Sequence, residues 1–315
     1  MTAAPNYTVD EMVNDVRNDY ITPQSQNLFL DTDIVKHLDK AMRSKIIPLI
    51  NSAREDYWVN VFDQPVTGQA SYTVPQRSAG AVLVNVVFID TNGNPIELNR
   101  LTTKKISSTF PFGYQLPLYT YGYYVQDDQI FLYPQQAQQA SQYKLRMIFM
   151  RRPNNLTLVS NCGKILTIAS NIITVDNIDP TWTTGTTFDI IQNFPQFNSI
   201  SDGATITNIN TATNQITLST APTGLSTGMY LCPTLMSCIP QIPYESYDVL
   251  IAAGAARVAR ALGDSQGSQL AEKNYEEASK DFIKLIQPRV QEATKKIVNR
   301  NNPFNFGIMG TPFLR

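Results

Sequence analysis

The chain has 315 residues, of which 43% are hydrophobic and 16% charged, and its formal net charge is −1. This length suffices for one elaborated domain or for two closely linked ones. The near-neutral charge argues against a protein that wraps nucleic acid, because neutralising phosphates requires clustered Lys and Arg.

Residues 1–60 predict two helices. Thr8 and Glu11 form a capping box, and the apolar residues that follow recur at helical spacing. We expect a second, long helix after Asp31 and Asp33, whose carboxylates would cap the helix start and favour the positive end of its dipole. Pro48 lacks a backbone donor, so a kink or break is expected near it.

Residues 61–153 change to short β-branched and aromatic runs with a period of two. Asn92 and Gly93 predict a tight hairpin between residues 82–90 and 95–98. Three more strands are expected at 119–125, 129–133 and 143–150. We interpret this region as a small antiparallel β unit.

Residues 154–238 are rich in Thr, Asn and Ile and contain few charges. Hairpins are predicted at 164–175 and 204–218. We interpret this region as an inserted β subdomain. Its low charge and high β propensity predict edges that need protection or a partner.

Residues 239–298 return to helical spacing. The segment from Tyr244 to Leu262 is apolar on nearly every side, and Gly263 is typical of a helix end. A last helix is expected to begin near Ser268 and to bend at Pro288. A helix without a polar face belongs inside a bundle. The sequence therefore predicts an α+β fold, with a helical-bundle core formed by N- and C-terminal helices and inserted antiparallel β domains.

Residues 299–315 predict an extended apolar tail. Two Pro and two Gly interrupt any regular period, yet large apolar side chains are frequent. Burying one such side chain stabilises by roughly 1.5–3 kcal/mol, so we expect the tail to be covered. It could pack on its own subunit or dock into a groove of another subunit or protein. The residues concerned are Phe304, Phe306, Ile308, Met309, Phe313 and Leu314.

Candidate catalytic residues have simpler structural explanations. His37 is the only histidine and falls within a predicted helix, where a surface position is expected. Carboxylate pairs occur at predicted helix starts or in a turn, where they cap backbone groups. We therefore predict a protein that is not an enzyme and has no catalytic residues. The pairs are Asp31 with Asp33, Asp127 with Asp128, and Glu245 with Asp248.

The three cysteines, Cys162, Cys232 and Cys238, lack CxxC spacing. A disulfide framework is not expected, and Cys232 with Cys238 lack a second pair at metal-ligand spacing. We expect small, buried or inert thiols. From this cysteine spacing the sequence predicts no metal-binding residues. No phosphate-cradling glycine loop is present, so the sequence also predicts no cofactor-binding residues and no cofactor.

Residues 242–264, IPYESYDVLIAAGAARVARALGD, precede a helix containing AEKNYEEASKDF. Together these segments resemble the helical core of the tailed-bacteriophage head-to-tail connector (adaptor) protein family. In residues 93–153, GNPIELNRL, QIFLYP and YKLRMIFMRRP are similar to the β unit that these adaptors carry, and the N-terminal helices match loosely. The segment 156–235 departs from the shorter adaptors, and we expect it to project outward and contact tail proteins or fibres.

The resemblance implies a structural virion protein that assembles and catalyses nothing. It implies a homo-oligomeric ring of twelve subunits beneath the portal protein, with double-stranded DNA passing through the lumen without sequence-specific binding. The tail nozzle, hub or fibre proteins would attach on the far side, and the six apolar residues of the tail segment would dock on the portal. We expect synthesis in the bacterial host cytoplasm and assembly into the virion. No membrane partner is expected, since no apolar run approaches membrane-spanning length.

Two alternatives remain open. A tail-hub or nozzle structural protein would also combine β domains with low charge. A carbohydrate-binding or adhesion module is suggested by the Asn and Thr content and by Tyr119, Tyr121, Tyr123 and Tyr124. Alternating tyrosines in a strand are more often core residues or cross-strand partners.

Overall fold

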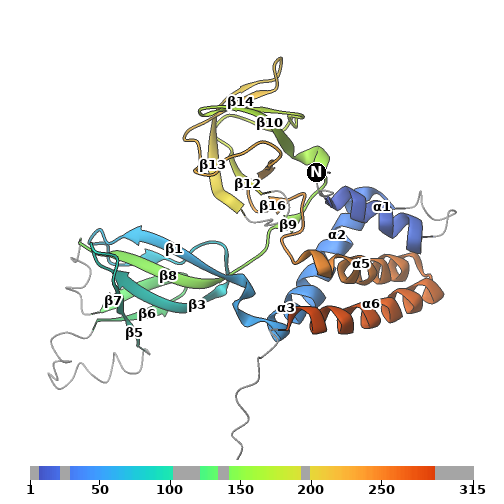
Figure 1. The fold of residues 1–315 in the computed structure, drawn as a ribbon, viewed down its shortest axis with the longest axis horizontal. Helices are drawn as coiled ribbons and strands as arrows, with labels where there is room; N and C mark the ends of the chain where they lie inside the picture. The colour runs from blue at the N-terminus through green and yellow to red at the C-terminus, as the bar shows by residue number, and fades with distance from the viewer. Residues whose placement is uncertain (1–6, 22–28, 102–120, 134–141, 193–198, 288–315) are drawn as a thin grey trace, which may run out of the picture.

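The computed structural model describes residues 7–21, 29–101, 121–133, 142–192 and 199–287. The fold contains several helices and mainly antiparallel sheets, including a closed barrel of six strands, which agrees with the predicted mixture of α and β structure. Three lobes extend from a common junction, and each contains a hydrophobic cluster of its own (Figure 1). We call them the helical lobe, the sheet lobe and the barrel.

The N-terminal helices follow the predicted pattern with two differences. The capping box of Thr8 and Glu11 starts α1 (Val9–Tyr20), as predicted. The second helix consists of α2 (Asp31–Ala41), a π-helical turn η2 (Met42–Ile46) and α3 (Ile47–Ala53). Pro48 lies in the first turn of α3, where its missing N–H costs little, so the irregular turn precedes it. The predicted caps Asp31 and Asp33 are wrong, because Leu30 is the N-cap and no side chain caps this helix.

The C-terminal helices pack on the N-terminal ones. After a short η6 (Tyr244–Ser246), α5 (Tyr247–Leu262) is buried on nearly all sides and contacts α1, α2 and α6. It ends as predicted at Gly263, whose φ of 78° is left-handed. Helix α6 (Ser265–Ile286) begins three residues before the expected start, because Asp264 caps it by accepting a hydrogen bond from the Gly267 amide (2.8 Å). The bend expected at Pro288 lies outside the described residues.

The sheet lobe contains two four-stranded sheets, ordered β1-β8-β3-β4 and β2-β7-β6-β5. All pairs are antiparallel except β5 with β6, so the expectation of a purely antiparallel unit was wrong for that pair. Side chains from both sheets form one core, including Phe88, Ile130 and Met147. The strands are β1 (Val59–Pro65), β2 (Tyr72–Thr73), β3 (Ser78–Ile89), β4 (Pro95–Glu97), β5 (Asn99–Arg100), β6 (Gly122–Gln126), β7 (Gln129–Tyr133) and β8 (Lys144–Arg151).

The predicted hairpins of the next region are confirmed, but their closure into a barrel was not predicted. The strand order is β10-β11-β14-β13-β12-β15, and β10 pairs with β15 to close the circle. Its interior is filled by apolar side chains such as Ile165, Phe188 and Ile206. The strands are β10 (Gly163–Ala169), β11 (Ile172–Val175), β12 (Thr187–Ile191), β13 (Ser199–Asn210), β14 (Gln215–Leu218) and β15 (Tyr230–Pro233).

Short connections join the lobes at the junction. The 3-10 turn η3 (Glu55–Trp58) leads from α3 into β1. The strands β9 (Asn155–Leu156) and β16 (Met236–Ser237) pair in parallel where the chain enters and leaves the barrel, and η5 (Val159–Asn161) follows β9. None of the helices in the described ranges combines the length and the apolar character that crossing a bilayer requires.

Candidate functional site

A buried group of charged and polar side chains lies where the three lobes meet. Arg77 precedes β3 and Arg151 ends β8, while Asp189 and Asp202 belong to the barrel strands β12 and β13. Asn154 lies in the connection between β8 and β9. We call these five residues the junction network.

Asp189 is the centre of the junction network and is fully buried. Its Oδ2 lies 2.5 Å from Nη2 of Arg77, and the two groups form an ion pair. The same oxygen accepts hydrogen bonds from the side-chain amide of Asn154 (3.0 Å) and the backbone N–H of Leu235 (2.7 Å). Arg77 also donates to Asn154 Oδ1 (2.5 Å), and its Nε lies 3.0 Å from Oδ2 of Asp202.

The charges of the junction network balance, because two guanidinium groups face two carboxylates. Burial lowers the pKa of Arg151 against the opposing attraction of Asp202, whose Oδ1 lies 3.5 Å from Nη2 of Arg151. A buried ion pair contributes little net stability, but its loss leaves an uncompensated charge. The network therefore fixes how the barrel sits on the sheet lobe, and its residues supply orientation rather than a nucleophile.

A pocket of about 470 Å³ opens beside the junction network. Its lining comes from η3 and the start of β1, from the end of β8 and the segment after it, from the start of β13 and from the segment before η6. It includes Tyr57, Pro153, Ser199 and Gln241. Burial raises the pKa of Tyr57 to about 12, so this phenol stays protonated at neutral pH. The lining residues include neither His nor Cys. Among the described lining residues, Ser199 therefore has no His beside it that could act as its base.

The outer strand of the first sheet exposes apolar side chains. Within the described residues β1 pairs only with β8, which leaves its other edge open. Val59, Val61 and Phe62 are 40%, 48% and 44% exposed, and we call them the apolar edge. Val59 and Val61 point to one face of the sheet and Phe62 to the other, because side chains alternate along a strand. An exposed apolar edge strand is a surface for association with another chain.

The residues predicted for tail docking lie outside the described residues: Phe304, Phe306, Ile308, Met309, Phe313 and Leu314. His37 lies in α2, with its ring centroid 5.8 Å from that of Phe29, and burial lowers its pKa. Asp31 forms an ion pair with Arg17 (2.6 Å), and Asp33 forms one with Lys36 (2.9 Å). None of these contacts pairs the histidine with a nucleophile.

The other two carboxylate pairs lie in a turn and at a helix start. Asp127, at φ 52°, and Asp128 form the turn between β6 and β7 in the sheet lobe, as predicted. Glu245 and Asp248 lie in η6 and the first turn of α5, in the helical lobe (Figure 1). The turn and the helix start are the positions that the sequence predicted for these two pairs.

The described tyrosines of β6 and its approach are packed as the sequence suggested. Tyr123 is 3% exposed and belongs to the sheet-lobe core. The ring of Tyr121 contacts Phe88 edge-on (5.5 Å between centroids), and Tyr124 stacks on its cross-strand partner Phe131 (5.0 Å). Tyr119 lies outside the described residues.

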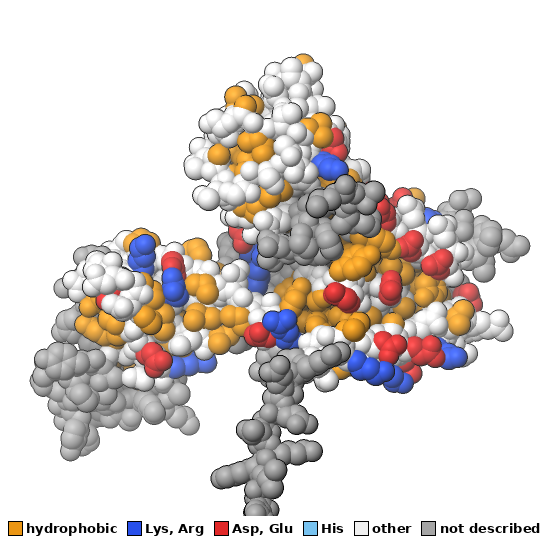
Figure 2. All heavy atoms as spheres, in the orientation of Figure 1, with side chains coloured by type: hydrophobic (Ala, Val, Ile, Leu, Met, Phe, Trp, Pro, Cys, Tyr) orange, Lys and Arg blue, Asp and Glu red, His pale blue; other side chains and the backbone are white. Residues whose placement is uncertain are grey.

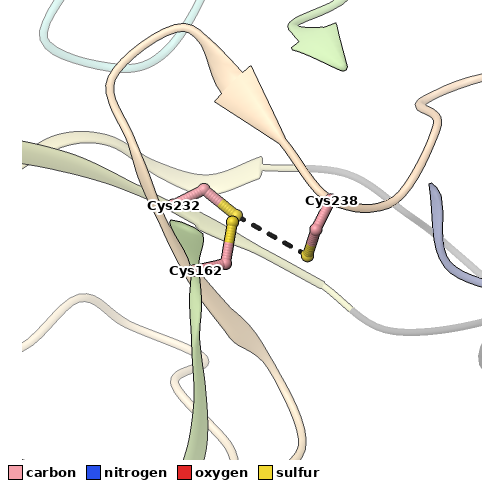
Figure 3. A group of neighbouring side chains, drawn as sticks. All are labelled: Cys162, Cys232 and Cys238. Atoms are coloured by element: carbon pink, nitrogen blue, oxygen red, sulfur yellow. Dashed lines mark hydrogen bonds between the residues drawn. The ribbon is translucent and has the colours of Figure 1, made fainter. Parts of the chain in front are cut away.

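Sequence reasoning missed that the three cysteines lie together. Cys162, Cys232 and Cys238 are all buried, as expected, but their sulfur atoms all lie within 4.8 Å of one another (Figure 3). Of the residues that the structure describes, these alone form a group of three or more His, Cys, Asp or Glu side chains that could hold a metal ion. We call them the thiol cluster.

Compared with known proteins, the chain matches no family model, and no curated protein is significantly similar to it.

Proposed function

We propose that this chain is a structural virion protein of a tailed bacteriophage: a head-to-tail adaptor that forms a ring beneath the portal. In this proposal double-stranded DNA passes through the ring without sequence-specific binding, and the tail attaches to its far side. The protein acts by assembly and not by catalysis. Its place in the finished particle is the interface between head and tail.

The observation that carries the proposal is the packing of α5 and α6. The segment that resembles the adaptor family forms these two helices, joined by Gly263 and Asp264, and α5 is buried against α1 and α2 from the other end of the chain. Both β regions lie between these helices in the sequence. This supports a helical-bundle core with β insertions, which is the organisation that the resemblance implies.

The surface properties also support an assembly protein. The apolar edge of β1 offers a contact for a neighbouring subunit, since burying a large apolar side chain stabilises by roughly 1.5–3 kcal/mol. A ring arises when the same heterologous contact repeats until it closes. The near-neutral charge of the chain suits a DNA conduit, because a strongly basic lumen would retain the phosphate backbone.

The barrel favours one alternative, a tail-hub or nozzle protein. Residues 163–233 contain only five charged side chains, and the visible face of the barrel is mostly uncharged (Figure 2). Such a surface suits a permanent contact with another structural protein. The packing of Tyr123 in the sheet-lobe core and of Tyr121 against Phe88 weakens the case for a carbohydrate-binding module, since a sugar-binding platform requires exposed rings.

The test is the mass of the purified chain in solution, alone and mixed with the portal ring encoded by the same genome. The full chain should bind the portal, whereas a chain ending at Asn299 should not. A variant with Phe304→Ser, Phe306→Ser and Phe313→Ser should fail in the same way, while a control with Asn301→Ser and Asn302→Ser in the same tail should bind normally.

The outcomes separate the competing functions. Equal binding by the full and the truncated chain would move the portal contact to the helices and refute the docking role of the tail. If neither chain binds the portal, the adaptor proposal fails and the tail-hub or nozzle alternative takes its place.

A further inference from the structure

The thiol cluster forms where the barrel closes. Gly163 of β10 is opposite Leu231 of β15, so the antiparallel register places Cys162 opposite Cys232. Cys238 follows β16 and approaches from the segment that leads towards the helical lobe (Figure 3). Residues from two distant parts of the chain are thereby held in one buried place.

The distances match those of thiolates around one metal ion. The sulfur atoms of Cys232 and Cys238 are 3.9 Å apart, and every pair in the cluster lies within 4.8 Å. A tetrahedral zinc ion with Zn–S bonds of about 2.3 Å separates its sulfur ligands by about 3.8 Å. All three side chains are at most 1% exposed, so the sulfur atoms are shielded from bulk solvent.

Burial and hydrogen bonding act in opposite directions on the three thiols. Burial by itself raises the pKa of Cys232, but the hydrogen bonds from Cys162 and Cys238 outweigh it and lower that pKa to about 5. The pKa of Cys162 is raised well above its usual value, chiefly by its hydrogen bond with Cys232, and that of Cys238 is raised chiefly by burial.

We propose that Cys162, Cys232 and Cys238 bind one Zn²⁺ ion that ties the barrel to the helical lobe. Binding forms three Zn–S bonds and releases to solvent the protons that the thiols carry, so that three thiolates and Zn²⁺ together have one negative charge. The fourth position belongs to water, because both carboxylate oxygens of the nearby Asp189 are already engaged by the junction network and backbone amides.

The ion would act at a point where the two lobes already touch. The backbone carbonyl of Cys238 accepts a hydrogen bond from the amide of Val9 at the start of α1 (2.9 Å). In the segment before Cys162, the amide of Val159 donates to Oδ1 of Asp10, also in α1 (3.0 Å). The thiol cluster belongs to the same hydrophobic cluster as the helices. Zinc would therefore couple the closure of the barrel to its seating on α1.

The first experiment measures metal in the full chain, produced without a polyhistidine tag in zinc-containing medium. Elemental analysis should find about one Zn²⁺ per folded chain. Each of Cys162→Ser, Cys232→Ser and Cys238→Ser should lose the bound zinc. As a control, Leu231→Ala removes a buried barrel side chain beside Cys232 that is not a ligand. It should lower the melting temperature and keep the zinc.

A second measurement does not depend on how the variants fold. The unaltered chain, stripped of metal with a chelator, is titrated with Co²⁺ while absorption and proton release are followed. We expect thiolate-to-cobalt charge-transfer bands that saturate at about one ion per chain, together with release of protons from the thiols. Zinc should then displace the cobalt and raise the melting temperature.

Two results would overturn the proposal. One is a folded, reduced chain that contains no zinc and gives no charge-transfer bands with Co²⁺. The other is intact-mass analysis that finds a disulfide between two of the three cysteines in the freshly purified chain, because the remaining thiol could not hold the ion alone. Neither result bears on the proposed adaptor function, whose test uses the portal.

Discussion

Replacing Asp189 with Ala should be far more costly than replacing an exposed aspartate in a similar ion pair. Asp189 is fully buried and compensates Arg77, which is 7% exposed. Breaking a buried pair by removing one partner costs about 3–5 kcal/mol. The matched control is Asp63→Ala, because Asp63 pairs with Arg146 at 2.7 Å but both side chains are more than a third exposed. Such a pair contributes about 0.2–1 kcal/mol.

The two losses of stability are different enough to be distinguished by the melting temperatures of the variants. The melting temperature shifts by the change in unfolding free energy divided by the entropy of unfolding. For a chain of this length that unfolds in one transition, a loss of 1 kcal/mol lowers the melting temperature by about 1.5 °C. Calorimetry should therefore find a loss of about 5–8 °C for Asp189→Ala and under about 2 °C for Asp63→Ala. Adding Arg77→Met to Asp189→Ala should recover part of the loss, because it removes the uncompensated cation. Equal losses in the two single variants would refute the view that the junction network holds the barrel in place.

Three further predictions test other parts of the molecule. Gly254→Val should lower the free energy of unfolding by about 1–3 kcal/mol in denaturant titrations, because a Cβ on Gly254 would meet Leu38 Cγ at 3.2 Å. The double variant with Leu38→Ala should lose less stability than the two single variants lose together, because the smaller side chain makes room for the valine. Stability should fall as the pH drops below about 6.5, where the unfolded chain protonates His37 before the folded chain does, and His37→Gln should reduce this fall. If the ring proposal holds, Val61→Ser with Phe62→Ser should weaken self-association about tenfold by mass photometry without lowering the melting temperature.

Helix ends were predictable because their signals are local. The capping box of Thr8 and Glu11 and the left-handed Gly263 each act within one turn, and both are found where the sequence placed them. The second helix was less predictable. Its irregular turn lies before Pro48 because the proline fits the first turn of α3. Asp31 forms an ion pair with Arg17 and does not cap the start of α2. Tertiary contacts decide such choices, and a single sequence does not display them.

The barrel and the thiol cluster could not be predicted for the same reason. Hairpins such as β10–β11 join neighbouring segments, but the closing pair β10–β15 joins residues nearly 70 positions apart. The position of Cys162 opposite Cys232 follows only from that pairing. The charge balance of Arg77 with Asp189 likewise spans two lobes. Spacing rules for metal ligands and ion pairs apply within one element and miss groups that are assembled across the fold.

The closing pair of the barrel also has an evolutionary consequence. Because β10 and β15 are neighbours, the chain enters and leaves the barrel at one edge, and a gene segment with adjacent ends can be exchanged by recombination as a cassette. The ion pairs of the junction network cross the boundary of this segment, since Arg77 and Arg151 lie outside the cassette while Asp189 and Asp202 lie within it. A replacement cassette must bring two carboxylates to the same places or arrive with new residues at both arginine positions. The four charges should therefore be inherited together.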